Sequence, residues 1–332
     1  MKKIIRIGTR DSQLAVWQAS LVKQQLSVQG ITGELVYIKS DGDLDLVTPL
    51  YEMGVQGVFT KTLDAALLNN RIDIAVHSMK DVPTRLAQGI QQAAVLARGS
   101  YKDLLVFTGE EENIFSELGY RNSEWSAVSS ELKVKDKLLT IHHSPLTVAT
   151  SSVRRKAQWL NRYPHHQIEN LRGNVNTRMQ KVADSDWNGA IFAAAGLERI
   201  GLRPAKSIEL DWMLPAPSQG AIMVACREED RDVYEACTAL NDTASAACTK
   251  IEKDFLRVLM GGCTTPISAL ATLKNDTVFF RGNILSLDGK EKIEVESVTP
   301  LKEIENLGTR SAHQLLAKGA DKIIESIRHA GI

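Results

Sequence analysis

The feature of this sequence that most constrains its fold is an alternation of short β-rich runs with amphipathic stretches of helical length. Near the N-terminus it predicts Lys3–Gly8 as a strand, Ser12–Gln25 as a helix, Glu34–Lys39 as a strand, Phe59–Asn69 as a helix and Ile72–Val76 as a strand. Further along it predicts Leu146–Ala149 as a strand, Arg154–Tyr163 as a helix, Gln167–Leu171 as a strand, Val175–Asp184 as a helix and Ala190–Ala194 as a strand. This alternation predicts α/β architecture. The two halves share no sequence repeat, and a shared topology remains open.

Two regions depart from this alternation. Residues 109–145 are polar and show no clear period, so we interpret them as a surface excursion between two α/β domains. From about Thr243 a long helix is expected to run to about Met260. Antiparallel strands then follow at Val278–Leu285 and Lys292–Val298, with a helix from about Gly308 to the end. We therefore expect a small α+β third domain in a chain of 332 residues, which is long enough for two or three domains.

The overall charge limits the classes of partner. Lysine and arginine together number 40, as do aspartate and glutamate. Proteins that mainly bind nucleic acid or an anionic membrane usually carry a basic excess, so we expect neither partner. The sequence also lacks a signal peptide and any apolar stretch of membrane-spanning length. These features predict a cytoplasmic protein in which any cationic site is local.

The four cysteines lie in the last third of the chain, at Cys226, Cys237, Cys248 and Cys263. None forms a CxxC pair or has a histidine at metal-ligand spacing, so we predict no metal site. In a reducing compartment disulfides are not expected either. A free cysteine is usually a small buried apolar residue. Only Cys263, which follows Gly261-Gly262, has surroundings that suggest another role.

Four predicted strand-to-helix junctions place an arginine or lysine beside Ser, Thr, Asn or Gly just as a helix begins. They are Gly8-Thr9-Arg10-Asp11-Ser12, His77-Ser78-Met79-Lys80-Asp81, Thr150-Ser151-Ser152-Val153-Arg154-Arg155 and Leu171-Arg172-Gly173-Asn174-Val175-Asn176-Thr177-Arg178. Helix N-termini bind anions, and guanidinium groups add charge-assisted hydrogen bonds. In any one junction taken alone, the arginine is more often a solvated surface charge and the Ser or Thr is most often a helix cap. Together they predict a cleft for a ligand with several negative groups.

An acid in one of the junctions and two aromatic residues between the last two junctions leave alternatives open. Asp81 is an acid among cations. It is either a helix cap or salt-bridge partner, or a carboxylate that faces the reacting centre of a substrate. Trp159 and Tyr163 lie among the arginines of residues 154–178, which raises nucleic-acid binding as a possibility. Their i, i+4 spacing instead favours a packed helix face.

Several motifs resemble those of the porphobilinogen deaminase (hydroxymethylbilane synthase) family. They occur in family order across nearly the whole chain: His77 to Pro83, Ala149 to Arg155, Leu171 to Arg178, Ala195 to Arg199, Leu214 to Ala221, and Glu252 through Gly261-Gly262-Cys263-Thr264-Thr265-Pro266. Each motif is short, and their joint occurrence is specific. Ala149 replaces a common glycine. The segment Ser40 to Gly57 lacks lysines frequent in bacterial members, so a role as a lid ending at Phe59 is favoured there over specific ion contacts.

The resemblance implies an α/β fold with two periplasmic-binding-protein-like lobes around a cleft and a small α+β C-terminal domain. The implied domains are 1–98 with 219–240, then 102–215 with the polar insertion near 109–145, then 243–332. The family's cofactor is dipyrromethane, attached here through a thioether to Cys263. The implied activity is a transferase reaction. Four porphobilinogen molecules are condensed head to tail with loss of ammonia, and water then releases hydroxymethylbilane. A monomer is expected.

The resemblance also implies roles for individual residues. Asp81 would stabilise positive charge on a pyrrole nitrogen and help to move protons. Each pyrrole carries an acetate and a propionate, which explains the need for cations. The residues expected to hold the cofactor are Cys263, Lys80, Ser78, Thr150, Ser151, Ser152, Arg154, Arg155, Arg172, Gly173, Arg178 and Gln219. Those expected to hold substrate are Arg10, Ser12, Phe59, Asn174 and Arg199.

Two other functions compete with this one. A non-catalytic two-lobe binding protein for a polyanionic small molecule would share the cleft arginines but gives no reason for Gly-Gly-Cys in a separate domain. An enzyme acting on phosphorylated substrates would need a glycine-rich phosphate loop, and the sequence has none. A covalently bound chromophore separates the deaminase from both.

Overall fold

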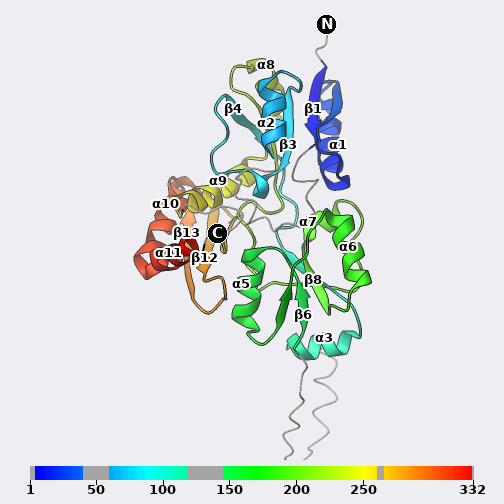
Figure 1. Cartoon of the computed structure of the whole chain (residues 1–332). Helices are drawn as coiled ribbons and strands as arrows, with labels where there is room; N and C mark the ends of the chain where they lie inside the picture. Colours follow the sequence, from blue (N-terminus) through cyan, green and yellow to red (C-terminus); the bar gives the residue numbers. More distant parts are fainter. Residues whose placement is uncertain (1–3, 40–59, 119–144, 260–264, 331–332) are drawn as a thin grey trace, which may run out of the picture.

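The computed structural model describes residues 4–39, 60–118, 145–259 and 265–330. Its strands form three sheets, two of five strands and one of three. Figure 1 shows them as two α/β lobes, one above the other, with a smaller domain beside them. The structure confirms the predicted fold class: two α/β lobes and a small α+β domain.

The first lobe is built on a sheet with strand order β2-β1-β3-β10-β4. β1 runs parallel to β2 and β3, while β10 is antiparallel to both β3 and β4. The strands are β1 (Ile5–Thr9), β2 (Gly33–Tyr37), β3 (Ile74–Ser78), β4 (Ile90–Val95) and β10 (Ile222–Arg227), and the helices are α1 (Gln13–Val28), α2 (Lys61–Leu68) and α8 (Arg231–Thr238). β10 comes from a distant part of the chain, which passes through all the strands of the second lobe before it returns to the first.

The second lobe repeats this topology with strand order β7-β6-β8-β5-β9. β6 runs parallel to β7 and β8, and β5 is antiparallel to β8 and β9. The strands are β5 (Asp103–Phe107), β6 (Thr147–Ala149), β7 (Gln167–Glu169), β8 (Gly189–Ala193) and β9 (Ser207–Glu209), and the helices are α3 (Glu111–Leu118), α5 (Val153–Arg162), α6 (Val175–Asp184) and α7 (Ala194–Glu198). The two lobes therefore share a topology, which the sequence had left open.

The ten elements predicted in the two lobes all occur, with ends displaced by a few residues. The strands β4, β5, β9 and β10 were not predicted. Ile222–Arg227 and Asp103–Phe107 are buried along their whole length, so they lack the alternation that marks a strand with one exposed face. Their antiparallel direction depends on where the chain crosses between the lobes.

The interpretation of residues 109–145 as an excursion without regular structure was wrong at its beginning. Glu111–Leu118 forms α3, which buries Ile114 and Leu118 in the core of the second lobe. Two apolar residues four positions apart form a stripe on one face of a helix. The run of glutamates that precedes them obscured this pattern. The rest of the excursion, residues 119–144, lies outside the described part of the chain.

The third domain packs helices on a sheet of order β11-β12-β13. Its elements are α9 (Thr243–Val258), β11 (Ile267–Lys274), β12 (Thr277–Leu285), β13 (Lys292–Pro300), α10 (Leu307–Leu315) and α11 (Asp321–His329). Both predicted strands are confirmed, and Phe255 of α9 packs against Phe280 of β12 with ring centroids 5.2 Å apart. The prediction of a single C-terminal helix was wrong, because the helical region is interrupted at Gly319, where φ is 98°.

A buried carboxylate joins the third domain to the segments that connect the lobes. The Glu252 side chain on α9 is fully buried and accepts hydrogen bonds from Arg98 Nη1 at 2.6 Å and Arg98 Nη2 at 3.1 Å. It also accepts from the backbone N–H of Ser218 at 2.5 Å and of Ala271 at 2.7 Å. Arg98 and Ser218 lie on the two crossing segments, and Ala271 lies on β11.

None of the helices in the described ranges is long and apolar enough to cross a membrane.

Candidate functional site

The four predicted junctions all follow the carboxyl ends of strands. Arg10 and Ser12 follow β1, and Lys80 and Asp81 lie in a short 3-10 turn, η2 (Met79–Asp81), after β3. The junctions after β6 and β7 open α5 and α6 in the second lobe. Carboxyl ends of parallel strands meet at one edge of a sheet, where ligands of open α/β folds bind. Each lobe therefore presents two junctions on its ligand-binding edge.

Two of the junction side chains also act as helix caps. Ser152 Oγ accepts the N–H of Arg155 at 3.4 Å, and Asn174 Oδ1 accepts the N–H of Thr177 at 2.9 Å. Ser12 is the N-cap residue of α1, but its side chain makes no capping hydrogen bond. The Ser12 hydroxyl is therefore not used to cap its own helix.

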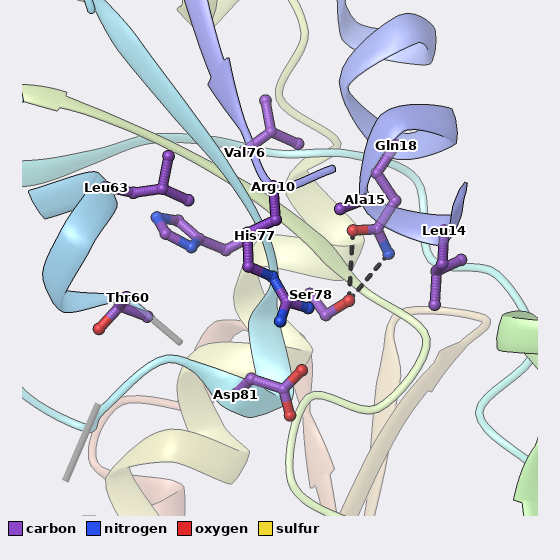
Figure 2. A pocket seen from close by; sticks show the side chains of 10 residues that line it. All are labelled: Arg10, Leu14, Ala15, Gln18, Thr60, Leu63, Val76, His77, Ser78 and Asp81. Carbon is purple, nitrogen blue, oxygen red and sulfur yellow. Dashed lines mark hydrogen bonds between the residues drawn. The ribbon is translucent and has the colours of Figure 1, made fainter. Parts of the chain in front are cut away.

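A pocket lies between the first two junctions (Figure 2). The space free of protein atoms there, counted together with the open solvent at the mouth of the pocket, is about 360 Å³. Arg10, Ser78 and Asp81 form its polar part, and Leu14 and Leu63 contribute apolar surface. Burial and the nearby Arg10 charge lower the pKa of His77 to about 4, so this lining residue is neutral near pH 7.

Ser78 is held in this pocket by Gln18 of α1. The Gln18 amide nitrogen lies 2.9 Å and its amide oxygen 3.2 Å from Ser78 Oγ (Figure 2). Gln18 is itself buried and lines the same pocket. Gln18 was not among the predicted site residues, because a polar residue within an amphipathic helix resembles any other solvent-facing position.

The second lobe brings arginines close to Asp81 of the first. Burial lowers the pKa of Arg178 to about 10. Repulsion from Arg155 and Arg172 adds to this lowering, and attraction to Asp81 opposes it. Burial likewise lowers the pKa of Lys80 to about 8. Asp81 and Asp103 oppose that shift, whereas Arg155 and Arg154 add to it. The site thus gathers five cations around two carboxylates.

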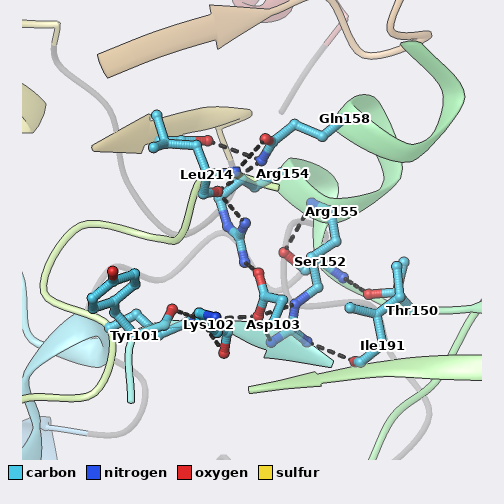
Figure 3. A network of polar contacts seen from close by, with 12 residues as sticks. Tyr101, Lys102, Asp103, Thr150, Ser152, Arg154, Arg155, Gln158, Ile191 and Leu214 are labelled. Carbon is cyan, nitrogen blue, oxygen red and sulfur yellow. Dashed lines mark hydrogen bonds and ion pairs between the residues drawn. The ribbon is translucent and has the colours of Figure 1, made fainter. Parts of the chain in front are cut away.

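Asp103, at the start of β5, is the centre of a buried network (Figure 3). Arg154 Nη2 donates to Asp103 Oδ2 at 2.7 Å, and Arg155 Nε and Nη2 donate to Oδ1 at 3.2 and 2.8 Å. The same arginines donate to the carbonyl oxygens of Leu214 at 2.6 Å and Ile191 at 2.8 Å. Burial alone raises the pKa of Asp103, but the two guanidinium charges and their hydrogen bonds hold it below its ordinary value.

Gln219 connects this network to the first lobe. Its side-chain nitrogen donates to Asp103 Oδ1 at 2.9 Å and to the carbonyl oxygen of Tyr101 at 2.8 Å. Its side-chain oxygen accepts from Lys80 Nζ at 3.5 Å. Gln219, which was predicted, therefore lies between the two lobes. Asp103 was missed, and its only sequence signal is a charged residue that opens the apolar run Asp-Leu-Leu-Val-Phe.

Some of the other predicted residues lie at the junctions of the second lobe, and Arg199 makes separate contacts. Thr150 is buried and its Oγ1 accepts the N–H of Ser152 at 3.2 Å, while the Ser151 hydroxyl lies 2.6 Å from Asn170 Oδ1. Gly173 has a φ of 116°, a value that favours glycine. Arg199 lies apart from the cluster, bonded to the carbonyl oxygen of Gly220 at 2.6 Å and 5.7 Å from the Trp17 ring centroid. Its assignment to substrate stays a prediction.

Three of the cysteines lie in the described part of the chain, and they agree with the prediction of small buried apolar residues. Cys226, Cys237 and Cys248 are buried and free. Burial disfavours the thiolate and raises the pKa of these thiols to about 11, 12 and 11. They are therefore small apolar core residues. Cys263 and Phe59, which were assigned to cofactor and substrate, lie outside the described residues.

Comparisons with known proteins agree with the motifs. Residues 5–235 match the family model "Porphobilinogen deaminase, dipyromethane cofactor binding domain", and residues 246–317 match "Porphobilinogen deaminase, C-terminal domain". The chain is 37% identical to the porphobilinogen deaminase of Desulforamulus reducens, covering 99% of each chain. It is 37% identical to that of Syntrophotalea carbinolica, covering 97% of this chain and 96% of the relative.

Among solved structures, the chain is similar to the VFT2 domain of BvgS from Bordetella pertussis. The TM-score is 0.39 at 12% identity, over 71% of this chain and 86% of that chain. The two family models together extend over both lobes and most of the third domain, and the relatives match over nearly their whole length. This chain belongs to the porphobilinogen deaminase family.

Proposed function

We infer that this protein condenses four porphobilinogen molecules head to tail, with loss of ammonia, on a dipyrromethane cofactor bound through Cys263, and then releases hydroxymethylbilane. The observation that supports this most directly is the excess of cations around Asp81. Asp81 attracts both Lys80 and Arg178, Arg155 and Arg172 lie close enough to Arg178 to repel its charge, and Asp103 is the second carboxylate beside these cations. A ligand that brings several carboxylates would relieve their mutual repulsion.

The described residues fit a dipyrromethane with acetate and propionate side chains. Arg178 Nε is buried and makes no hydrogen bond within the described residues. Among the described residues, Arg155 uses three of its five N–H donors on Asp103 and Ile191, which leaves two that could donate to a ligand. We propose that Arg155, Arg172, Arg178 and Lys80 hold the carboxylates of the cofactor, with Ser152 and Thr150 at the opening of α5. When bound, the cofactor supplies the pyrrole chain to which substrate is added.

We assign the catalytic role to Asp81. It lines the pocket together with Arg10 and Ser78 (Figure 2), so substrate bound there is within reach of its carboxylate. Positive charge that develops on the substrate's pyrrole nitrogen is stabilised by this fixed negative charge. The carboxylate can also accept the proton that leaves after each carbon–carbon bond forms. Arg10 and Ser12 hold the substrate's own carboxylates, and Gln18 orients Ser78.

Several finer expectations remain proposals. We propose a hydroxymethylbilane synthase that acts as a cytoplasmic monomer, with domain boundaries at 1–98 with 219–240, 102–215 and 243–332. The domain boundaries are supported by the strand order of the sheets, in which β10 returns to the first lobe. The roles given to Phe59, Asn174 and Arg199 rest on the family resemblance.

Intact mass spectrometry tests the function. We expect wild-type protein, or apo-protein incubated with porphobilinogen, to exceed its sequence mass by two linked pyrroles. Cys263→Ser should lack this excess. Cys248→Ala, which removes a buried thiol from the same domain, is the matched control and should retain it.

The same experiment decides between enzyme and binding protein. A wild-type protein that binds porphobilinogen but never gains the covalent adduct would be a two-lobe binding protein for anionic molecules. An adduct that persists in Cys263→Ser would show that another residue carries the cofactor.

A further inference from the structure

We propose that Asp103 is a positioning residue that holds Arg154 and Arg155, and through Gln219 also Lys80, in the arrangement that binds the carboxylates of substrate and cofactor. The inference rests on the proposed function and adds a residue to it. Asp103 belongs to neither of the two sets of residues expected to touch ligand. Its side chain is fully buried, so it acts through its neighbours.

Several hydrogen bonds converge on the Asp103 carboxylate. Four N–H groups from three side chains donate to its two oxygens, at 2.7, 2.8, 2.9 and 3.2 Å. Planar guanidinium groups bound in this way lose their freedom to rotate. Arg155 is bound through Nε and Nη2 together, which fixes the plane of its guanidinium group. The direction of its remaining donors therefore depends on Asp103.

The negative charge of Asp103 also offsets the positive charges of Arg154 and Arg155. Arg154 and Arg155 follow each other at the start of α5 and are buried at 4% and 6% exposure. Two adjacent cations at a helix N-terminus are unfavourable both with each other and with the helix dipole. Asp103 offsets this repulsion with one buried negative charge. Without it the arginines would separate or draw in another anion, so the geometry of the site would change.

Asp103 is also connected to Lys80 through Gln219. Gln219 donates to Asp103 and accepts from Lys80, so one side chain relates the position of a cation in the first lobe to a carboxylate in the second. The Asp103 charge also favours the protonated form of Lys80, against its burial and the nearby arginines. Loss of the charge should therefore make Lys80 deprotonate at a lower pH, which gives a readout that a merely structural residue would not affect.

Asp73 provides a matched control. It is also a buried aspartate that opens a strand region and binds two arginines, Arg6 at 2.8 Å and Arg227 at 3.3 Å. It lies before β3, at the end of the strand opposite the pocket-lining residues His77 and Ser78. Asp73→Asn should lower thermal stability as Asp103→Asn does, because each change removes a buried carboxylate that pairs with a buried arginine.

The experiment compares the pH dependence of kcat/KM for porphobilinogen in wild type, Asp103→Asn and Asp73→Asn, together with the rate of adduct formation followed by intact mass. For Asp103→Asn we expect KM to rise about tenfold or more and adduct formation to slow, as when charge-assisted contacts are lost. The alkaline fall in kcat/KM should begin at lower pH than in wild type. Asp73→Asn should keep the wild-type KM and pH profile.

Each outcome is decisive. A folded Asp103→Asn with the KM and pH profile of wild type would overturn the proposal, as would an Asp73→Asn that shifts both equally. If Asp103→Asn does not fold, Asp103→Glu takes its place. The longer side chain keeps the charge but displaces the arginines, so KM should rise while the alkaline limb stays in place, and an unchanged KM would refute positioning. Wild-type protein that gains no adduct would instead refute the proposed function.

Discussion

Asp81 and Asp103 share cationic neighbours but differ in exposure. Asp103 is fully buried, and both of its oxygens accept hydrogen bonds from arginine or glutamine. Asp81 is half-buried and lines a pocket that is open to solvent. A carboxylate surrounded by fixed donors can organise those donors, whereas one that faces a pocket can interact with a ligand. At the scale of single residues, accessibility therefore separates a positioning acid from a catalytic one.

Asp81→Asn tests this division. Because the asparagine has nearly the same shape but no charge, we expect a folded protein whose kcat falls by about 10²- to 10⁴-fold, the range typical of general acid–base residues. Steady-state turnover of porphobilinogen and far-UV circular dichroism provide the measurements. Asp11→Asn, at an exposed acid of the first junction, is the control and should keep near-normal turnover. Similar turnover in both variants would remove Asp81 from the catalytic role.

At the scale of elements, short turns decide which groups reach the site. η2 begins directly where β3 ends, so Lys80 and Asp81 project at the sheet edge rather than along a long helix. In the third domain a backbone turn has a different effect. Gly319 interrupts the C-terminal helical region with φ of 98° and ψ of 15°, and separates α10 from α11. This break allows both helices to bury apolar residues, Leu315 on one side and Ile323 on the other.

Substitution of Gly319 measures the importance of the break. A Cβ atom there would lie 3.9 Å from Ile293 Cδ1, so the cost comes from the backbone conformation rather than from a clash. We expect Gly319→Ala to lower the free energy of unfolding by about 1 kcal/mol. Gly319→Asn should cost less, because asparagine tolerates the left-handed region better. Urea unfolding of both variants tests this order, and an alanine variant as stable as wild type would contradict it.

At the scale of the whole molecule, Glu252 joins three parts of the structure. Its carboxylate accepts from Arg98 on one crossing segment, from Ser218 on the other and from Ala271 in the third domain. α9, which carries Glu252, also leads towards the segment that contains Cys263. This buried ionic contact therefore helps to fix the position of the third domain relative to the lobes.

Glu252→Gln should be strongly destabilising, because it leaves the Arg98 guanidinium group without its carboxylate. Removal of one partner from a buried ion pair typically costs about 3–5 kcal/mol. Asp254→Asn is the control on the same helix. Its partners Lys250 and Arg257 are exposed, so we expect a loss of less than about 1 kcal/mol. Urea unfolding of both variants is the measurement, and equal losses would show that Glu252 has no special role in joining the domains.

The local structure of this protein could be predicted from its sequence. The ten predicted elements of the lobes and the four cationic junctions follow from hydrophobic period and helix-start chemistry, which involve only neighbouring residues. The helix α3 and the break at Gly319 were missed for local reasons as well. A run of glutamates obscured a two-residue apolar stripe, and one glycine within a helical pattern does not by itself indicate an interruption.

The combination of distant residues could not be predicted without the three-dimensional fold. Strand β10 pairs with β3 and β4 although more than 120 residues separate them in sequence. Asp103 acquires its role because Arg154, Arg155 and Gln219 reach it from 51, 52 and 116 residues away. A buried carboxylate gives no periodic signal, and its function depends on which charges the fold brings within hydrogen-bonding distance. The sequence thus determined which residues can bind anions, and the fold decided how their charges are held together.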